Sequence, residues 1–483
     1  MRPAPRSLSA LLGFFGLLVT RIADAEPPAA VVPSPPVAAV LSAPPPPVVD
    51  DPMLAPVPSP KRVVGTWAEA MGLLWSRSTN LKTALDQVLQ AEGQTMVAFA
   101  QYLPALGGCA GGSSAPPGCG NATYTHQLLT HRTVQNVTGE PTSSVVPIPD
   151  TLIASLTLSQ DLINVQEFDQ IGINRLMEDQ THMTVEDTRR TLALSLATQI
   201  VSVVTAERSA EINRVGLRTA LEQLELTKRR ANLGAAMLLD VVRADQNAEN
   251  ARVALVNGDE TLREARESLG LILGVPEETG VSREMNVDGL AQDAMGACRP
   301  VATVDERPDV RAAVTNVHVA KRNLQNTWYS FLPVITLQSS LSATSAVNAG
   351  YPNPTWSIGA ALSLPIFDGG TRFGTLKSER AAQDIAEQSF LALERQDLIQ
   401  VEQAERGIVV AQQSYNVALR QRALAAQNDT LTQALWSRGQ GTSVDLVTAS
   451  EAHRQAEQTL VVAEFGLVKA RLAAVMALAT CTG

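Results

Sequence analysis

Two long stretches without proline constrain the fold more than any other feature of this sequence. No proline occurs in residues 150–275 or in residues 366–483, and a proline inside a helix would break it. The hydrophobic pattern predicts a long helix, a tight turn and a returning helix in each stretch: 164–231 and 236–273, then 370–438 and 444–478. At 1.5 Å per residue each long helix would reach roughly 100 Å. A helix of that length needs a partner helix along its length, as in a coiled coil.

The two stretches belong to a duplicated unit. A shift of 205 positions places Gly234 on Gly439 and Asp240 on Asp445, and further matches continue in the same register. A Leu-Pro pair, Leu103-Pro104 or Leu332-Pro333, ends the first helix of each copy. Evenly spaced matches indicate an internal repeat. The predicted organisation is a first repeat at 62–275, a connecting segment at 276–306 and a second repeat at 307–483.

Alternating residues predict two strands in each repeat, within about 104–162 and 334–366. From Trp356 to Leu364, for example, larger apolar side chains alternate with small ones, as in a strand with two different faces. About ten such residues match a tilted strand that crosses a bilayer, but they match an ordinary half-buried sheet equally well. Four strands per chain cannot close a barrel, and lipid does not tolerate open sheet edges. Strands that cross a bilayer would therefore have to be shared among several chains.

The N-terminal residues predict export. Two arginines precede an apolar run from Leu8 to Val19, and an Ala-Asp-Ala cleavage site ends at Ala25, so residues 1–25 are a predicted signal peptide. The apolar run is too short to span a bilayer as a helix. Residues 26–61 are rich in proline, alanine and valine, which predicts an extended, disordered linker.

Composition and charge restrict the function. Hydrophobic residues make up 45% of the chain but aromatic residues only 4%, which suits thin bundles of Ala/Leu/Val helices better than a single globular core. The net charge of −10 argues against nucleic acid as a partner. The short basic cluster Lys228-Arg229-Arg230 is expected to be a solvated helix end.

No metal site, cofactor or catalytic set is predicted. The five histidines are scattered, no cysteine pair has metal-ligand spacing, and neither a Ser/His/Asp set nor a phosphate loop is recognisable. An even number of cysteines in an exported chain predicts disulfides. Cys109 and Cys119 flank a Gly/Ser/Pro-rich loop and are expected to pair locally, which leaves Cys298 to pair with Cys481.

This order of parts resembles the TolC-like outer-membrane efflux protein family. The resemblance rests on the duplication, the two Leu-Pro pairs, the segments Arg307–Ala313 and Leu364–Gly370, and the two Gly-x5-Asp turns. It covers roughly residues 66–478. It implies a mainly α-helical fold with a small membrane β-barrel: in a homotrimer, four strands per chain would form a 12-stranded barrel, continued by a coiled-coil tunnel.

The resemblance also implies a function and partners. The protein would be a channel in the outer membrane of a Gram-negative-type bacterium, extending into the periplasm and passively exporting drugs, other small molecules or proteins. The implied partners are a periplasmic membrane-fusion (adaptor) protein, an inner-membrane transporter and outer-membrane lipid. No nucleic acid, cofactor or enzymatic step is expected.

The two turns are the predicted functional site. Gly234 and Gly439 are expected as C-cap glycines. Asp240 and Asp445 lie in the first turns of the returning helices, where a carboxylate stabilises the helix dipole by about 0.3–1 kcal/mol. In a trimer they would alternatively form an acidic ring that favours cations. The resemblance places these turns at the periplasmic tip, where the tunnel narrows and the adaptor docks, and adds three residues as contacts or closure elements: Leu233, Trp436 and Arg438.

One departure from the family pattern weakens the predicted acidic ring at the turns, and the aromatic residues near the strands allow two interpretations. Some members of the family carry a second acid three positions after the first, whereas this chain has Arg243 and Thr448 there. Four aromatic residues near strand ends would form a membrane girdle or simply pack where helices meet strands: Tyr102, Phe331, Trp356 and Phe367.

The alternative function is a soluble periplasmic coiled-coil adaptor or scaffold, which explains the helices and the signal peptide but not the paired strands.

Overall fold

The computed structural model describes residues 47–101, 103, 107–108, 119–125, 130–135, 141–146, 151–345 and 354–481. Some predictions concern residues outside this part. They are the signal peptide, the linker as far as residue 46, Tyr102, and the Cys109–Cys119 pair, of which Cys109 is not described. Val48–Gly483 forms one compact unit. Among the described residues, no helix combines the length and the apolar character that crossing a membrane requires.

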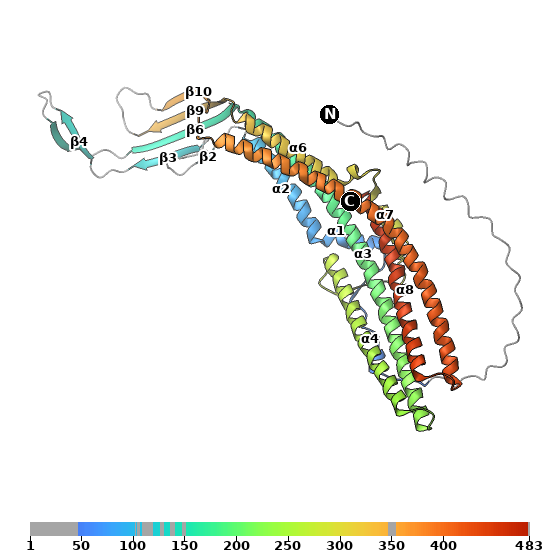
Figure 1. The fold of residues 1–483 in the computed structure, drawn as a ribbon. Helices are drawn as coiled ribbons and strands as arrows, with labels where there is room; N and C mark the ends of the chain where they lie inside the picture. Colours follow the sequence, from blue (N-terminus) through green and yellow to red (C-terminus); the bar gives the residue numbers. More distant parts are fainter. Residues whose placement is uncertain are drawn as a thin grey trace, which may run out of the picture. The chain divides into compact units, whose positions relative to one another are not determined.

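Long helices dominate this unit (Figure 1). The helices are α1 (Trp67–Arg77), α2 (Thr79–Gln101), α3 (Val165–Asn232), α4 (Leu238–Ile272), α5 (Leu290–Ala297), α6 (Pro308–Tyr329), α7 (Thr371–Ser437) and α8 (Ser443–Ala477), with short 3-10 turns η1 (Pro52–Leu54) and η2 (Val304–Glu306). The strands are β1 (Arg62–Val64), β2 (Gly107–Gly108), β3 (Cys119–Thr125), β4 (Thr130–Gln135), β5 (Pro141–Val146), β6 (Thr151–Ile163), β7 (Thr279–Val281), β8 (Arg299–Pro300), β9 (Val334–Thr344), β10 (Thr355–Ser363) and β11 (Ala479–Thr480). The four long helices α3, α4, α7 and α8 begin and end within two residues of the predicted positions.

The two longest helices begin in different ways. Asn164 caps α3, and its Oδ1 accepts a hydrogen bond from the Glu167 amide at 3.2 Å. Before α7, the Asp368 carboxylate accepts from the amides of Gly370 and Arg372, both at 3.0 Å. Gly370 has φ 92°, a left-handed conformation that residues with a side chain rarely adopt. The Gly pair that only the second repeat contains is therefore required by the way its long helix starts.

The long helices lie side by side in one layer, with α3 running through its middle (Figure 1). Towards the sheet, α3 packs between α2 and α6, and α6 packs in turn on α7. Towards the turns, α3 packs between α4 and α8, and α8 packs on α7. Consequently α7 forms one edge of the layer, and α2 and α4 form the other.

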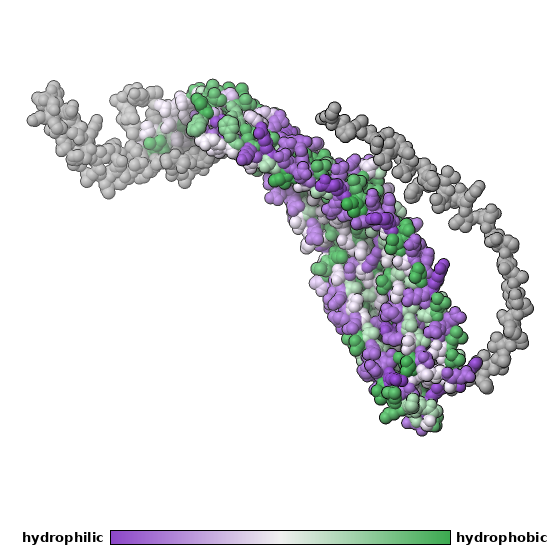
Figure 2. Space-filling model, viewed as in Figure 1, coloured by the Kyte–Doolittle hydropathy of each residue, from purple (hydrophilic) through white to green (hydrophobic). Residues whose placement is uncertain are grey.

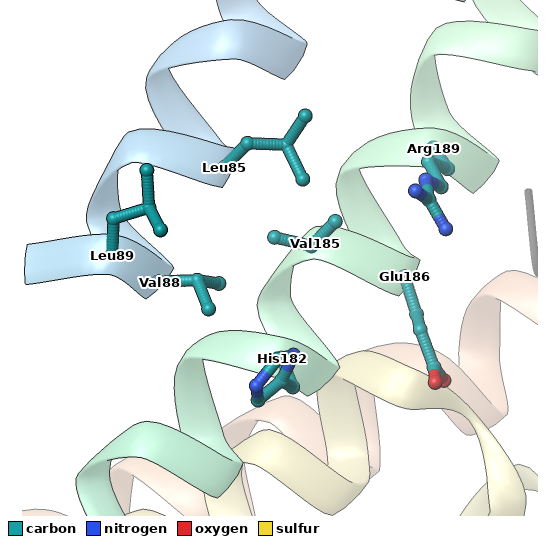
Figure 3. Close-up of a pocket in the computed structure, with 7 residues that line it drawn as sticks. All are labelled: Leu85, Val88, Leu89, His182, Val185, Glu186 and Arg189. Atoms are coloured by element: carbon teal, nitrogen blue, oxygen red, sulfur yellow. The ribbon is translucent and has the colours of Figure 1, made fainter. Parts of the chain in front are cut away.

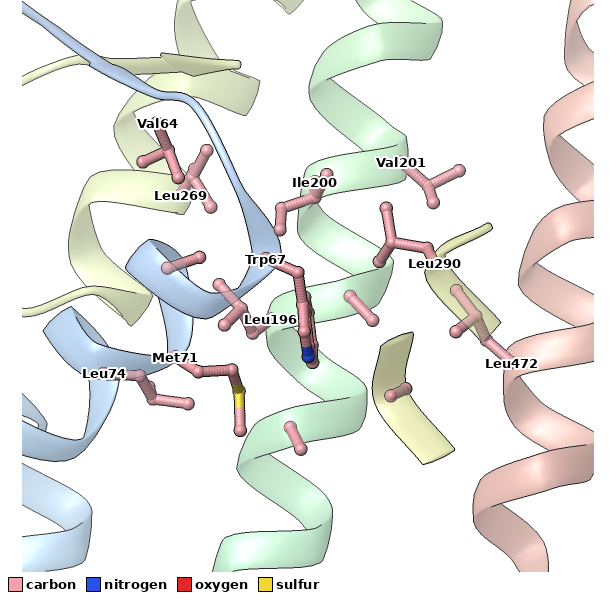
Figure 4. Close-up of a cluster of buried hydrophobic side chains, with 14 of the residues drawn as sticks. Val64, Trp67, Met71, Leu74, Leu196, Ile200, Val201, Leu269, Leu290 and Leu472 are labelled. Carbon is pink, nitrogen blue, oxygen red and sulfur yellow. The ribbon is translucent and has the colours of Figure 1, made fainter. Parts of the chain in front are cut away.

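The largest hydrophobic core surrounds the middle of α3 (Figure 4). Leu196 and Ile200 of α3 have no exposed surface there and lie around Trp67 of α1. The ends of α4 and α8 and the short α5 complete this core, through Leu269, Leu472 and Leu290. A disulfide joins Cys298 to Cys481 at a Cα–Cα distance of 4.1 Å, which is the pairing expected from the sequence. It ties the connecting segment between the two repeats to the segment that follows α8.

A buried side-chain amide, that of Asn213, joins three helices between this core and the turns. Asn213 of α3 donates to the Ala254 carbonyl of α4 at 2.9 Å and accepts from Arg454 Nη1 of α8 at 3.1 Å. A Cβ at Gly258 would come within 2.5 Å of Asn213 Nδ2, so α4 needs a glycine at this crossing. Because a buried amide without partners is costly, Asn213 helps to hold the three helices in register.

The last part of the predicted disordered linker is instead ordered and packed. We call residues 48–61 the strap. Val49, Met53 and Leu54 pack on the apolar seam between α3 and α4. Asp51 pairs with Arg252 of α4 at 2.8 Å, and further along the strap the Pro58 carbonyl accepts from Arg266. The prolines allow only the short 3-10 turn η1 within the strap, but they do not prevent the apolar side chains between them from packing on the seam.

The first repeat also contains more strands than predicted. The main sheet has the order β10-β9-β6-β3-β2, and β4 and β5 pair separately as an antiparallel hairpin. The pairs β10–β9, β9–β6 and β6–β3 are antiparallel, whereas β2 pairs with β3 in parallel. The sequence predicted two strands in this repeat, because the polar, Thr-rich segment before β6 lacks the apolar alternation that marks β9 and β10.

Candidate functional site

One face of the sheet is apolar across three neighbouring strands. Trp356 of β10 lies opposite Leu341 of β9, which lies opposite Leu156 of β6. At the other end of the strands Leu362 lies opposite Ile335, which lies opposite Ile163 after a bulge. Trp356 and Leu362 are each 69% exposed. The single chain therefore leaves a mostly apolar band uncovered, in which Ser339 and Gln160 are the polar exceptions among these paired positions, and such a band marks a surface for lipid or for another protein.

The opposite face of the sheet is polar. Ser340 and Ser357 are hydrogen-bonded across β9 and β10 at 2.7 Å. Thr336 of β9 donates to the Asp161 carboxylate of β6 at 2.8 Å. The same register therefore separates an apolar face from a hydroxyl- and carboxylate-bearing face, an arrangement that suits a wall between a nonpolar medium and water.

Hydrophobic surface also gathers where α6 and α7 meet the sheet (Figure 2). Ile366 and Phe367 are 91% and 86% exposed. Phe331 instead packs edge-to-face on Phe373 at 5.5 Å between ring centroids, with the Arg372 guanidinium 4.8 Å from the Phe331 ring. Of the predicted girdle residues, Trp356 and Phe367 are thus exposed, and Phe331 takes part in packing between helix and strand.

Both turns end their long helices with a left-handed glycine. Gly234 has φ 74° and Gly439 has φ 76°. The amides of Ala235 and Gln440 donate to the carbonyls of Arg230 and Leu435, five residues earlier, at 2.8 and 3.0 Å. These bonds satisfy carbonyls that a helix end leaves without partners, as in a Schellman cap.

The two predicted aspartates cap the returning helices. Asp240 accepts from the Met237 amide, and Asp445 accepts from the Thr442 amide, both at 3.2 Å. The Thr442 hydroxyl also donates to Asp445 at 2.7 Å. The hydroxyl and amide of Thr442 lower the pKa of Asp445 from its ordinary value, so this exposed carboxylate is ionised at neutral pH. The local role of both residues is therefore helix capping.

Two contacts that the sequence did not predict join the hairpins. The Arg230 guanidinium lies 3.7 Å from the ring centroid of Trp436 and donates to the carbonyls of Trp436 and Ser437 at 3.1 and 3.3 Å. The Ser443 hydroxyl donates to Asp240 Oδ1 at 2.5 Å. We call these two contacts the tip latch. The expectation that Arg230 belongs to a solvated helix end is wrong, because its planar cation reaches the Trp436 and Ser437 carbonyls at the end of α7 in the other repeat.

The remaining predicted tip residues face solvent in the single chain. Leu233 is 83% exposed, and its neighbours Met237 and Leu238 are 66% and 77% exposed. Arg438 is exposed beside Trp436. The structure thus brings Asp240, Trp436 and both glycines together at one end of the layer. Only the pairing across the two repeats, which needs tertiary structure, shows that Arg230 and Ser443 belong with them.

Comparison with known proteins finds similar sequences and a similar fold. Nodulation protein T of Rhizobium leguminosarum is 27% identical over 51% of this chain and 54% of its own length. The pyoverdine export outer membrane protein OpmQ of Pseudomonas aeruginosa is 26% identical over 63% of this chain and 60% of its own. The chain therefore spans only about half to three fifths of the curated relatives it matches.

A solved structure shows the same fold. The outer membrane protein VceC of Vibrio cholerae superposes with a TM-score of 0.66 at 17% identity, covering 85% of this chain and 95% of that one. The comparisons give no support to the alternative of a soluble adaptor. The profile of the outer membrane efflux protein family matches residues 71–275 and 300–483, which is most of both repeats. The chain belongs to the outer membrane efflux protein family.

Proposed function

We propose that this chain is a subunit of the outer-membrane exit duct of an efflux system. The observation that carries this proposal is the strand register that places Trp356, Leu341 and Leu156 on one exposed face, while the hydrogen-bonded hydroxyls of Ser340, Ser357 and Thr336 lie on the other. A sheet of this kind suits lipid on one side and a water-filled lumen on the other. The duct itself performs no chemistry, and transport through it is passive.

The open edges of the sheet call for other copies of the chain. In the described part of the sheet, β10 has β9 as its neighbour on one side, and unpaired backbone groups are not tolerated in lipid. Three chains with the longer strands β3, β6, β9 and β10 each supply the strands of a closed 12-stranded barrel. This closure supports a homotrimer.

The edges of the helical layer call for the same arrangement. An exposed stripe on α7 repeats every seven residues: Val410, Val417, Leu424 and Leu431. That spacing is typical of a coiled-coil seam, yet none of the described helices covers it. The edge helix α4 carries its own exposed stripe: Leu239, Val242, Val253 and Val256. A neighbouring copy that packs its α4 edge on the α7 edge buries both stripes and closes the layer into a tunnel.

The turns are the proposed meeting point with partners. Leu233, Met237 and Leu238 form an exposed apolar tip on which the helical hairpins of a periplasmic adaptor protein would dock, and an inner-membrane transporter would supply the energy. Asp240 and Asp445 from three copies would form the acidic ring. Opening would move α7 and α8 away from α3 and α4, and it would require the tip latch to break.

Small organic molecules are the proposed cargo. The names of similar proteins refer to pyoverdine export and to toluene and antibiotic efflux, and these cargoes are small compounds. Their export favours the same class of substrate here over whole proteins.

Membrane fractionation with chemical cross-linking tests this function. The full chain expressed in a Gram-negative host should remain with the outer membrane after a carbonate wash and should cross-link as a trimer. A single charge on the apolar band, Leu341→Asp, should reduce the outer-membrane fraction, whereas the matched change on the polar face, Ser340→Asp, should be tolerated. A freely soluble monomer in the periplasm would refute the proposal.

A further inference from the structure

Two glutamates and a histidine converge between α2 and α3, away from the turns and the sheet. One ligand atom each from Glu92, Glu178 and His182 lies within 4.8 Å of the others. Glu178 and His182 are four residues apart, so they share one face of α3, and α2 packs along α3. Side chains from two helices that are distant in sequence therefore approach one point.

Among the described residues, neither Glu92 nor Glu178 has a lysine or arginine in ion-pair distance. Glu186, two helical turns after Glu178, differs, because it lies 3.8 Å from Arg311 and accepts from Thr480. Glu178 accepts instead from the Thr95 hydroxyl at 3.0 Å. Two carboxylates this close repel each other, and a cation between them removes the repulsion.

A pocket begins beside the histidine. His182 lines a cavity of about 480 Å³ between α2 and α3 (Figure 3). Its other walls combine apolar side chains of both helices with a charged rim: Leu85, Val88, Leu89, Val185, Glu186 and Arg189. Figure 3 shows the imidazole on the α3 side, near Val88 of α2. The cavity is roomy enough for water next to the imidazole, which a three-ligand metal needs to complete its coordination.

We infer that Glu92, Glu178 and His182 bind a divalent transition metal ion of the Zn²⁺ type. An imidazole nitrogen with two carboxylates is a donor set that suits zinc, whereas Ca²⁺ and Mg²⁺ prefer oxygen ligands alone. Thr95 orients Glu178 as an outer-shell hydrogen-bond donor. The ion would clamp α2 onto α3. The sequence did not indicate this site because Glu92 comes from a different helix, so no short ligand spacing exists.

Metal titration of the full chain in detergent tests this inference. After EDTA stripping, the protein should bind one Zn²⁺ per chain, with Co²⁺ producing visible absorption from an imidazole- and carboxylate-ligated ion. His182→Gln or Glu92→Gln should weaken Zn²⁺ binding by more than about tenfold, since even outer-shell changes cost about 10–100-fold. Thr95→Val should fall within that outer-shell range. His318→Gln, which changes an exposed histidine on α6, is the matched control.

A second readout does not depend on spectroscopy. Zn²⁺ should raise the unfolding temperature of the wild type and of His318→Gln but not of His182→Gln, because a ligand stabilises only the state that binds it. Excess Ca²⁺ should not displace the Zn²⁺. Absence of saturable Zn²⁺ binding, or equal binding by the wild type, His182→Gln and Glu92→Gln, would overturn the inference.

Discussion

The two longest helices occupy equivalent places in the two repeats but very different surroundings. α3 has 68 residues, of which 20 are buried, whereas α7 has 67 residues, of which five are buried. α3 has neighbours on both sides, and α7 lies at the edge of the layer. The difference assigns the two helices separate purposes under the proposed assembly: α3 builds the folded chain, and α7 is the proposed surface for the next copy.

A buried ion pair, rather than an apolar core, holds the middle of α7, which fits its low burial compared with α3. Its middle is anchored through Asp397, which is 1% exposed and lies 3.2 Å from Arg307 of the loop before α6. Arg307 also pairs with Asp309 at 2.6 Å, and Asp309 lies 3.4 Å from Arg190 of α3. A buried ionic group therefore connects the edge helix to the central one where α7 has little apolar burial.

Breaking this anchor should have the largest effect on stability. Arg307→Met leaves the buried Asp397 without its cation and weakens the pairing of Asp309. Removing one partner of a buried ion pair costs about 3–5 kcal/mol. Denaturant unfolding of the purified chain, followed by helical circular dichroism, measures this loss.

Asp397→Asn is the matched control for the anchor. Burial, and next the charge of Asp309, raise the pKa of Asp397, so its charged form is disfavoured in the folded protein. Its contribution to stability is fully present below the ordinary aspartate pKa and is lost as pH rises through the raised value. The Asn variant should lack this pH-dependent loss and should be much less destabilised than Arg307→Met. Equal destabilisation of both variants would contradict the anchor.

Leucine deletions on α3 and α7 should separate folding from assembly. Leu217 of α3 is fully buried, and Leu424 of α7 is 67% exposed. Leu217→Ala should lower the free energy of unfolding by about 2–5 kcal/mol, as for other core leucines. Leu424→Ala should change the unfolding of the single chain by less than about 0.5 kcal/mol but weaken the proposed trimer, as measured by cross-linking and native mass spectrometry. If both variants lowered chain stability alike, α7 would not be an assembly surface.

Removing the strap should affect only the first hairpin. The strap covers the seam between α3 and α4 through Met53 and Leu54, and the second hairpin has no equivalent segment among the described residues. Deletion of the strap, residues 48–61, should therefore increase amide hydrogen exchange in α4 while leaving α8 nearly unchanged. A uniform increase in both hairpins would show that the strap stabilises the whole layer instead.

The smallest expected effect concerns the caps of the returning helices. Thr442→Ala removes the hydroxyl that caps α8 and should cost about 0.5–2 kcal/mol. The hydroxyl and amide of Thr442 lower the pKa of Asp445, so the stabilisation by Asp445 is present above the ordinary aspartate pKa and is lost as pH falls through the lowered value. Thr442→Ala should reduce that acid-dependent loss, as pH-dependent unfolding would measure. Met237→Thr, at the equivalent position in the first repeat, should stabilise α4 if the hydroxyl is the cause.

Much of the architecture was predictable because it depends on local signals. Proline positions, left-handed glycines and the 3.6-residue period determine where α3, α4, α7 and α8 begin and end. The residue type at a turn also limits its backbone, so Gly234 and Gly439 were recognisable as helix ends. The strap was not predictable in this way, because its packing depends on a seam that exists only after α3 and α4 have met.

The candidate site likewise combines features that local sequence predicts with features that only tertiary structure reveals. By itself, the sequence determined the duplicated hairpins, the apolar and polar faces of β9 and β10, and the capping aspartates, since each is encoded within a few neighbouring residues. Only the tertiary structure decided that Arg230 covers Trp436, that Asp240 meets Ser443, that Glu92 faces His182 and that α7 stays uncovered. The physical reason is that these contacts join residues far apart in the chain, and their energies arise only once the helices lie side by side.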